Sequence, residues 1–65
     1  MTEHSSCVLY EELSDGTWHE VASGVYAYTF SDAHWLFIEA GIMKRNTTYK
    51  IYLTKTNESR IYHRR

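Results

Sequence analysis

The sequence predicts an α+β fold, with an antiparallel sheet of about five strands and one short helix in the order β-β-β-α-β-β. Short runs of alternating apolar and polar residues, separated by turn residues, are typical of antiparallel strands. One longer apolar stretch, residues 31–43, has capping residues at both ends, which favours a helix. The 65 residues, 43% of them hydrophobic, suffice for one small domain over residues 1–65.

The first half of the chain is predicted to form three strands, at residues 7–13, 18–21 and 25–30. Asp15-Gly16 favours a two-residue type I′ turn, which would place Leu13 opposite Trp18. Gly24 indicates a second, weaker turn between the second and third strands. These signals predict a three-stranded meander before the helix.

The predicted helix has matching signals at its two ends. Ser31 can cap the N-terminus, and the charge of Asp32 suits the positive end of the helix dipole. Gly41 predicts a left-handed stop, after which Ile42 would contact the last turn. The alternative is a strand, based on the β propensity of residues 35–38, and it would give an all-β six-stranded small barrel. We favour the helix because both caps fit.

Two further strands are predicted at residues 48–54 and 60–63, joined by a turn at residues 56–59. Residues 1–6 are expected to be a flexible N-terminus and residues 64–65 a frayed C-terminus. The pattern leaves the inward side of the first strand open. The predicted core is Val8, Leu9 or Tyr10, Val21, Tyr26, Tyr28, Phe30, Trp35, Ile38, Ile51, Leu53 and Ile61.

Charge is sorted along the chain although the formal net charge is only −1. Residues 1–39 carry seven acidic residues and no Lys or Arg, whereas residues 40–65 carry seven basic residues and Glu58 as the only acid. Such asymmetry indicates either a charged partner surface or pairing of acidic with basic strands inside the fold.

The apolar stretch also predicts a surface that the chain cannot cover by itself. On a helix, Trp35 and Ile38 share one face, Leu36 lies on a second and Phe37 on a third. A 65-residue monomer with one sheet covers only one side of such a helix. The remaining side would need a partner protein, a second copy of the chain or a closed barrel.

Several functional classes are disfavoured by size and spacing. A chain of this length has little volume for a deep pocket, so we expect no enzyme, no cofactor and no small-molecule substrate. His4 and Cys7 have no second close ligand pair, so we expect no metal site. The first hairpin would also keep His19 far from Cys7, which argues against a catalytic pair.

The expected cellular compartment follows from the single cysteine and from the lack of targeting signals. One cysteine cannot form an internal disulfide, which favours a reducing compartment and therefore the cytoplasm. The N-terminus lacks the basic start and apolar stretch of a signal peptide. The longest apolar run is four residues, so we expect no membrane span.

The leading hypothesis is a non-catalytic protein-interaction module of the inhibitor, adaptor or regulator type, with a protein partner or a homodimer. Its size also fits a protein encoded by a phage or mobile element. Aromatic side chains are frequent anchors of interfaces. The candidate interaction residues are Trp35, Phe37, Leu36 and Trp18.

The alternative is a protein that binds single-stranded nucleic acid, above all RNA. Aromatic residues on a sheet, flanked by cations, stack bases while holding phosphates. If the last two strands pair as a hairpin, one face is expected to present Lys50, Tyr52, Arg60, Tyr62 and Arg64. A sequence pI near 6.4 does not favour this alternative.

Overall fold

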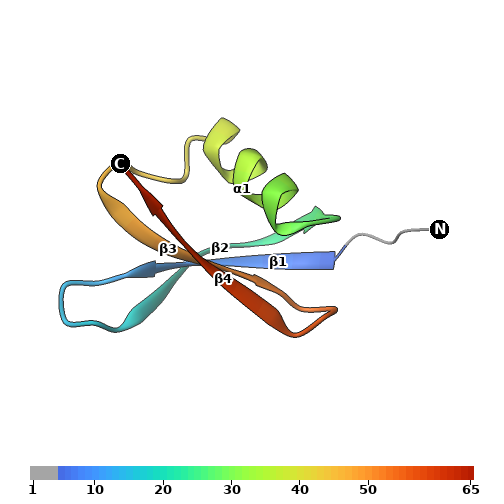
Figure 1. Cartoon of the computed structure of the whole chain (residues 1–65), viewed down its shortest axis with the longest axis horizontal. Helices are drawn as coiled ribbons and strands as arrows, with labels where there is room; N and C mark the ends of the chain where they lie inside the picture. Colours follow the sequence, from blue (N-terminus) through green and yellow to red (C-terminus); the bar gives the residue numbers. More distant parts are fainter. Residues whose placement is uncertain (1–4) are drawn as a thin grey trace.

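The sheet has four antiparallel strands, and one helix lies along one side of it (Figure 1). The computed structural model describes residues 5–65. Its elements are β1 (Ser5–Glu12), β2 (Trp18–Ala27), α1 (Phe30–Glu39), β3 (Thr47–Leu53) and β4 (Glu58–Arg64). The strand order is β2-β1-β3-β4. The α+β class is confirmed, whereas the prediction of five strands and the barrel alternative are wrong.

The two faces of the sheet have different surroundings. Alternate residues of each strand point to opposite faces. One face, the covered face, packs against α1 and forms the core, whose buried members are Cys7, Leu9, Ala27, Phe30, Ala33, Phe37, Met43, Tyr49, Ile51 and Leu53. The other face, the open face, meets no helix or strand of residues 5–65 (Figure 1).

The turn between β1 and β2 is one residue longer than predicted. The Leu13 N–H donates to the Thr17 carbonyl at 2.8 Å, and the Gly16 N–H donates to the Leu13 carbonyl at 2.9 Å. Gly16 has φ +85°, the left-handed conformation that completes a three-residue loop. Glu12 therefore lies opposite Trp18. The predicted pairing of Leu13 with Trp18 is wrong, and every side chain at the start of β2 changes face.

β2 passes through the second predicted turn as one strand with bulges. Cys7 lies opposite Val25, but the residue two positions further along β1 lies opposite Ala22. Gly24, with φ +78°, lies within this shift. A bulge accommodates the extra residues where a turn would have started a new strand. The predicted third strand is therefore wrong, since its first residues belong to β2 and Phe30 belongs to α1.

The start of α1 is capped by a residue outside the predicted helix. Thr29 accepts a hydrogen bond at its Oγ1 from the Asp32 N–H at 3.1 Å. The Asp32 carboxylate in turn accepts from the Tyr28 N–H at 3.2 Å. The first bond satisfies a donor that the first helical turn leaves without an internal partner, and the second ties the residue before the N-cap to that turn. Asp32 is confirmed in the first turn, but the predicted cap Ser31 is wrong because it lies inside the helix.

The stop of α1 agrees with the prediction. The Gly41 N–H donates to the Ile38 carbonyl at 3.0 Å, and the Ile42 N–H donates to the Phe37 carbonyl at 3.2 Å. Gly41 has φ +73°. This pair of bonds with a left-handed glycine is a Schellman motif. Within residues 5–65, no helix is long and apolar enough to cross a membrane.

The buried stripe of α1 differs from the predicted one. Phe30, Ala33 and Phe37 are buried at spacings of three and four residues. Trp35 is 60% exposed and Leu36 is 37% exposed, so both point away from the core. The prediction of Trp35 as a core residue is wrong because Phe30 is the first residue of the helix and sets the buried side.

The β3–β4 hairpin turns earlier than predicted. Leu53 lies opposite Glu58, so the loop covers residues 54–57 rather than 56–59. Asn57 has φ +58°, which completes the reversal. β4 therefore starts two residues before the predicted strand. The early turn places Lys50 opposite Ile61.

Strands of the sheet extend close to both ends of the described chain. Ser5 and Ser6 belong to β1, and residues 1–4 of the predicted flexible N-terminus lie outside the described residues. Arg64 is the last residue of β4 and lies opposite Thr47. Its guanidinium Nη1 donates to the Met43 carbonyl. Arg64 therefore belongs to β4, whereas the sequence predicted that the last strand ends at residue 63.

The predicted core is correct mainly in β3 and at the start of α1. Its buried members are Leu9, Phe30, Ile51 and Leu53, and Ile38 packs against them. Tyr10 is only partly buried, as is Val8, and both lie on the open face. The wrong members, all exposed, are Val21, Tyr26, Tyr28, Trp35 and Ile61. Val21 and Tyr26 lie in β2, where a loop one residue longer than predicted and the bulges change the faces of the strand. Tyr28 lies between β2 and α1, Trp35 lies on the outer side of the helix, and Ile61 lies opposite Lys50 on the open face.

Candidate interaction site

An aromatic cluster lies on the open face. Its members, here called the open-face cluster, are Val8, Tyr10, Trp18, Lys50 and Tyr52. They come from β1, β2 and β3, and each is partly exposed. Tyr10 is at the centre, because it lies opposite Lys50 on one side and Glu20 on the other. Three neighbouring strands thus contribute to one surface.

Trp18 joins this cluster because of the three-residue loop before it. Residues directly opposite in an antiparallel pair point to the same face. Trp18 lies opposite Glu12, two residues after Tyr10, and therefore shares the open face with them. The predicted two-residue turn would have placed it with Leu13 and Leu9 on the covered face.

Lys50 brings a positive charge into the aromatic surface. Its Nζ lies 4.4 Å from the centre of the Trp18 ring and 6.0 Å from that of Tyr10. A cation over aromatic rings is attracted by their π electrons. Lys50 is the only Lys or Arg that the four strands place on the open face. The cluster therefore combines apolar area with one charge.

Polar groups surround the open-face cluster. Glu12 and Glu20 lie on the β1–β2 side. On the β3–β4 side, Thr48 Oγ1 and His63 Nδ1 are 2.8 Å apart in a hydrogen bond. The Tyr52 hydroxyl donates to the amide oxygen of Asn57. An apolar centre with a polar rim is the usual composition of a protein–protein interface.

The four predicted interaction residues do not form one site. Phe37 lies on the buried side of α1 and is fully buried, so its assignment to an exposed interface is wrong. Trp35 and Leu36 lie on the outer side of α1. Trp18 alone lies on the open face, on the other side of the sheet.

The predicted nucleic-acid residues are divided between the two faces. Lys50 and Tyr52 lie on the open face, whereas Arg60, Tyr62 and Arg64 lie opposite covered-face positions of β3. The expectation of one shared basic and aromatic face is therefore wrong. Its cause is the register of the β3–β4 hairpin, which places even-numbered residues of β3 opposite odd-numbered residues of β4.

Each of the three β4 residues also has a partner on the covered face. The Arg60 guanidinium lies 4.9 Å from the centre of the Phe30 ring. The Tyr62 ring is 4.6 Å from the His34 ring of α1. Arg64 donates to the Met43 carbonyl. These side chains connect β4 to the helix and to the loop after it.

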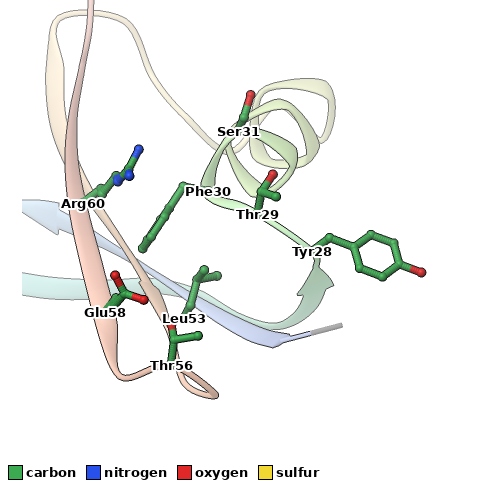
Figure 2. Close-up of a pocket in the computed structure, with 8 residues that line it drawn as sticks. All are labelled: Tyr28, Thr29, Phe30, Ser31, Leu53, Thr56, Glu58 and Arg60. Atoms are coloured by element: carbon green, nitrogen blue, oxygen red, sulfur yellow. The ribbon is translucent and has the colours of Figure 1, made fainter. Parts of the chain in front are cut away.

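A shallow pocket of about 350 Å³ lies between the start of α1 and the β3–β4 turn (Figure 2). It is lined by Tyr28, Thr29, Phe30, Ser31, Leu53, Thr56, Glu58 and Arg60. In Figure 2 the Tyr28 ring points away from the pocket. Its charged groups, Glu58 and Arg60, have opposite signs, and Arg60 packs on Phe30.

The reactive residue types in the described part of the chain do not converge. Cys7 is free and fully buried, and its thiol lies 3.5 Å from the Ser5 carbonyl. Burial raises the pKa of this thiol and so disfavours the reactive thiolate. Among residues 5–65, no three His, Cys, Asp or Glu side chains lie close enough to hold a metal ion. His4 lies outside the described residues.

Sequence reasoning did not assign Val8 and Tyr10 to a site. Both were core candidates because they belong to an apolar strand. The alternation along β1 was visible, but nothing in the sequence showed which set of residues faced the helix. The inward side was clear only for β3, where the alternation predicted that Tyr49 and Ile51 face the core. In the structure both lie on the covered face, opposite β1.

Comparison with known proteins adds no assignment. No family model matches this chain, and no curated protein or solved structure matches it significantly. Function is therefore argued from the open face, the pocket and the charges.

Proposed function

We propose that this chain is a non-catalytic protein-interaction module that binds its partner through the open-face cluster. The observation that carries the proposal is the position of Tyr10, Trp18 and Tyr52 on a sheet face without a covering element in residues 5–65. Rigid strands hold these aromatic side chains, so little side-chain entropy is lost on binding. Aromatic residues in such positions are typical anchors of interfaces.

The charges of the open face indicate which groups a complementary partner surface would carry. Lys50 lies beside Tyr10 and Trp18, so a partner carboxylate above it would gain a charge-assisted hydrogen bond. Glu12 and Glu20 lie to one side and favour a basic group there. The proposed partner surface is therefore apolar at its centre, with a carboxylate over Lys50 and a cation towards β2.

Nucleic-acid binding receives less support from the same geometry. A phosphate backbone needs several cations beside the stacking rings. Beside Tyr10, Trp18 and Tyr52, the strands supply only Lys50, and Glu12 and Glu20 would repel phosphates. The arginines of β4 lie on the opposite face.

Catalysis also receives little support. The pocket near α1 is shallow and its arginine is packed on Phe30. The only thiol of the described chain is buried. These observations are consistent with a binding role.

The test is a direct binding measurement with a partner isolated from cells of the natural source. The partner captured by the wild-type chain is identified, purified and titrated against variants in solution. We expect Tyr52→Ser and Lys50→Glu each to weaken binding at least about tenfold, because each removes a central contact. Trp35→Ser and Lys44→Glu are matched controls on other surfaces and should leave affinity within about twofold of wild type.

Two results would contradict this assignment. Equal loss of affinity in Trp35→Ser and Tyr52→Ser would place the interface elsewhere. Salt-sensitive binding of wild-type protein to single-stranded RNA or DNA, abolished by Lys50→Glu, would favour the nucleic-acid alternative instead. Unfolding curves of each variant separate lost binding from lost folding.

A further inference from the structure

The two edge strands differ in how well they accept another strand. β4 pairs with β3 over all of its seven residues without a register shift. Its outer backbone edge has no strand beside it in residues 5–65. β2, at the other edge, has two register shifts and a left-handed Gly24. Bulges obstruct pairing at an edge, whereas a regular strand is a template for it.

A second copy of the chain can add to β4 only in a few registers. Two identical strands related by a two-fold axis pair antiparallel, and opposite residues must belong to the same face. Three registers then pair at least five residues of each strand, and they are centred on Arg60, Ile61 or Tyr62. The remaining registers pair three residues or fewer.

Charge selects one of these three registers. The register centred on Arg60 places Arg60 opposite its own copy, and the register centred on Tyr62 places Arg60 opposite Arg64 twice. Like charges directly opposite each other destabilise a sheet. The register centred on Ile61 instead places Glu58 opposite Arg64 at both ends, and Arg60 opposite Tyr62. It also pairs all seven residues.

Ile61 gives this register an apolar centre. Its side chain is 65% exposed, which is unusual for isoleucine. In the selected register it lies opposite Ile61 of the second copy on the open face. Arg64 gives one donor to the Met43 carbonyl, and its guanidinium has further donors for Glu58 of the second copy.

We propose that two copies of this chain associate through β4, antiparallel and centred on Ile61, to form one continuous eight-stranded sheet. The dimer joins the open faces of both copies into one surface. It requires no residue of the open-face cluster, so the dimer and the binding role can fail separately.

The first test is the oligomeric state across a dilution series that reaches millimolar concentration, measured by analytical ultracentrifugation. Wild-type chain is expected to be a dimer that dissociates on dilution. Ile61→Asp places two carboxylates opposite each other and should weaken the dimer at least about tenfold. Because Ile61 is exposed, folding should be unaffected. Trp35→Asp, on the outer side of α1, is the control and should still dimerise.

Charge exchange tests the register itself. Glu58→Arg alone places arginine opposite Arg64 and should weaken the dimer. Adding Arg64→Glu to the same chain restores opposite charges and should recover the dimer. In the register centred on Tyr62, Glu58 is unpaired, so Glu58→Arg would not weaken the dimer; in the register centred on Arg60, Arg64 is unpaired, so Arg64→Glu would not restore it. Only the register centred on Ile61 predicts both the weakening and the recovery.

Three results would overturn the proposal. A wild-type chain that stays monomeric at millimolar concentration has no such interface. A dimer that survives Ile61→Asp but is lost in Tyr52→Ser would join the open faces instead of the edges. A double variant at Glu58 and Arg64 that stays as weak as Glu58→Arg would exclude this register.

Discussion

The covered and open faces of this sheet are built from the same four strands, yet they have different roles. On the covered face, Leu9, Tyr49 and Ile51 are fully buried under α1. On the open face, Tyr10 and Tyr52 occupy the alternate positions of the same strands and remain partly exposed. Both sets are apolar or aromatic. Residue type alone therefore does not identify the core, because strand register and the position of the helix decide which set is buried.

The largest expected effect separates buried from exposed positions on α1. Phe37→Ala removes a fully buried ring and should lower the free energy of unfolding by about 3–5 kcal/mol. Trp35→Ala, two residues earlier and 60% exposed, should change it by about 0.5 kcal/mol or less. Urea unfolding followed by circular dichroism measures both. Similar losses in the two variants would contradict the assignment of the helix face.

A second comparison sets a residue of the covered face of the sheet against a residue of the open face. Leu9→Ala, on the covered face, should cost about 2–5 kcal/mol of unfolding free energy because it leaves a cavity in the core. Ile61→Ala should cost about 0.5 kcal/mol or less in the monomer, since its side chain is already in solvent. The measurement is urea unfolding at a concentration where the chain is monomeric. A large loss in Ile61→Ala would show that something covers the open face.

The stop of α1 limits how much of the covered face the helix reaches. Gly41 has φ +73°, and a Cβ in this conformation costs roughly 1–2 kcal/mol. Gly41→Ala should therefore lower the unfolding free energy by about that amount. No atom blocks a Cβ at Gly41, so any loss reflects backbone conformation alone. Thermal unfolding of Gly41→Ala and Gly41→Asn, which tolerates this φ better, is the check. Equal stability of all three chains would contradict this explanation.

The Lys50–Trp18 contact should have a smaller effect. Lys50→Met keeps the apolar stem but removes the charge above the Trp18 ring. The expected loss is about 0.5–1 kcal/mol, with a change in tryptophan fluorescence. Lys44→Met, at an exposed loop position, is the matched control. An unchanged spectrum in Lys50→Met would contradict the contact.

The smallest expected effect concerns the turn that places Trp18 on the open face. Hydrogen bonds from the Thr17 hydroxyl and N–H, at 2.6 and 3.0 Å, lower the pKa of the Asp15 carboxyl below its ordinary value. Its stabilising contribution is thus present above the unfolded-state pKa and is lost as pH falls through the lower folded-state value. Asp15→Ala should therefore make the free energy of unfolding fall less steeply as pH drops through the range in which this carboxyl takes up its proton. An NMR titration in which Asp15 shows the ordinary pKa of an aspartate would contradict the effect of the two Thr17 hydrogen bonds.

The sequence was sufficient for the fold class, the helix and its stop, because these depend on local signals. Gly41 and Ile42 form the predicted Schellman motif from a few neighbouring residues. Strand faces depend on loop lengths, and loop signals tolerate more than one length. The Asp15-Gly16 pair fits a two-residue turn as well as the three-residue loop that forms.

The candidate site was harder to predict for the same reason. Trp18 was predicted as an interaction residue, but the predicted turn length assigned it to the same face as Leu13 and Leu9 rather than Tyr10. The basic residues of β4 were expected to share one face with Lys50. A four-residue loop, whether at the predicted residues 56–59 or at the observed residues 54–57, instead pairs even-numbered residues of β3 with odd-numbered residues of β4. Charge sorting was visible in the sequence, and the strand order keeps acidic β1 and β2 together on one side of basic β3 and β4.

The most direct test of the open face is site-specific photo-crosslinking in cells of the natural source. A photoreactive phenylalanine analogue replaces Tyr52 in one chain and Trp35 in another, so that each chain reports one side of the molecule. We expect a discrete adduct with a partner protein from position 52 and none from position 35. An adduct from position 35 alone would contradict it.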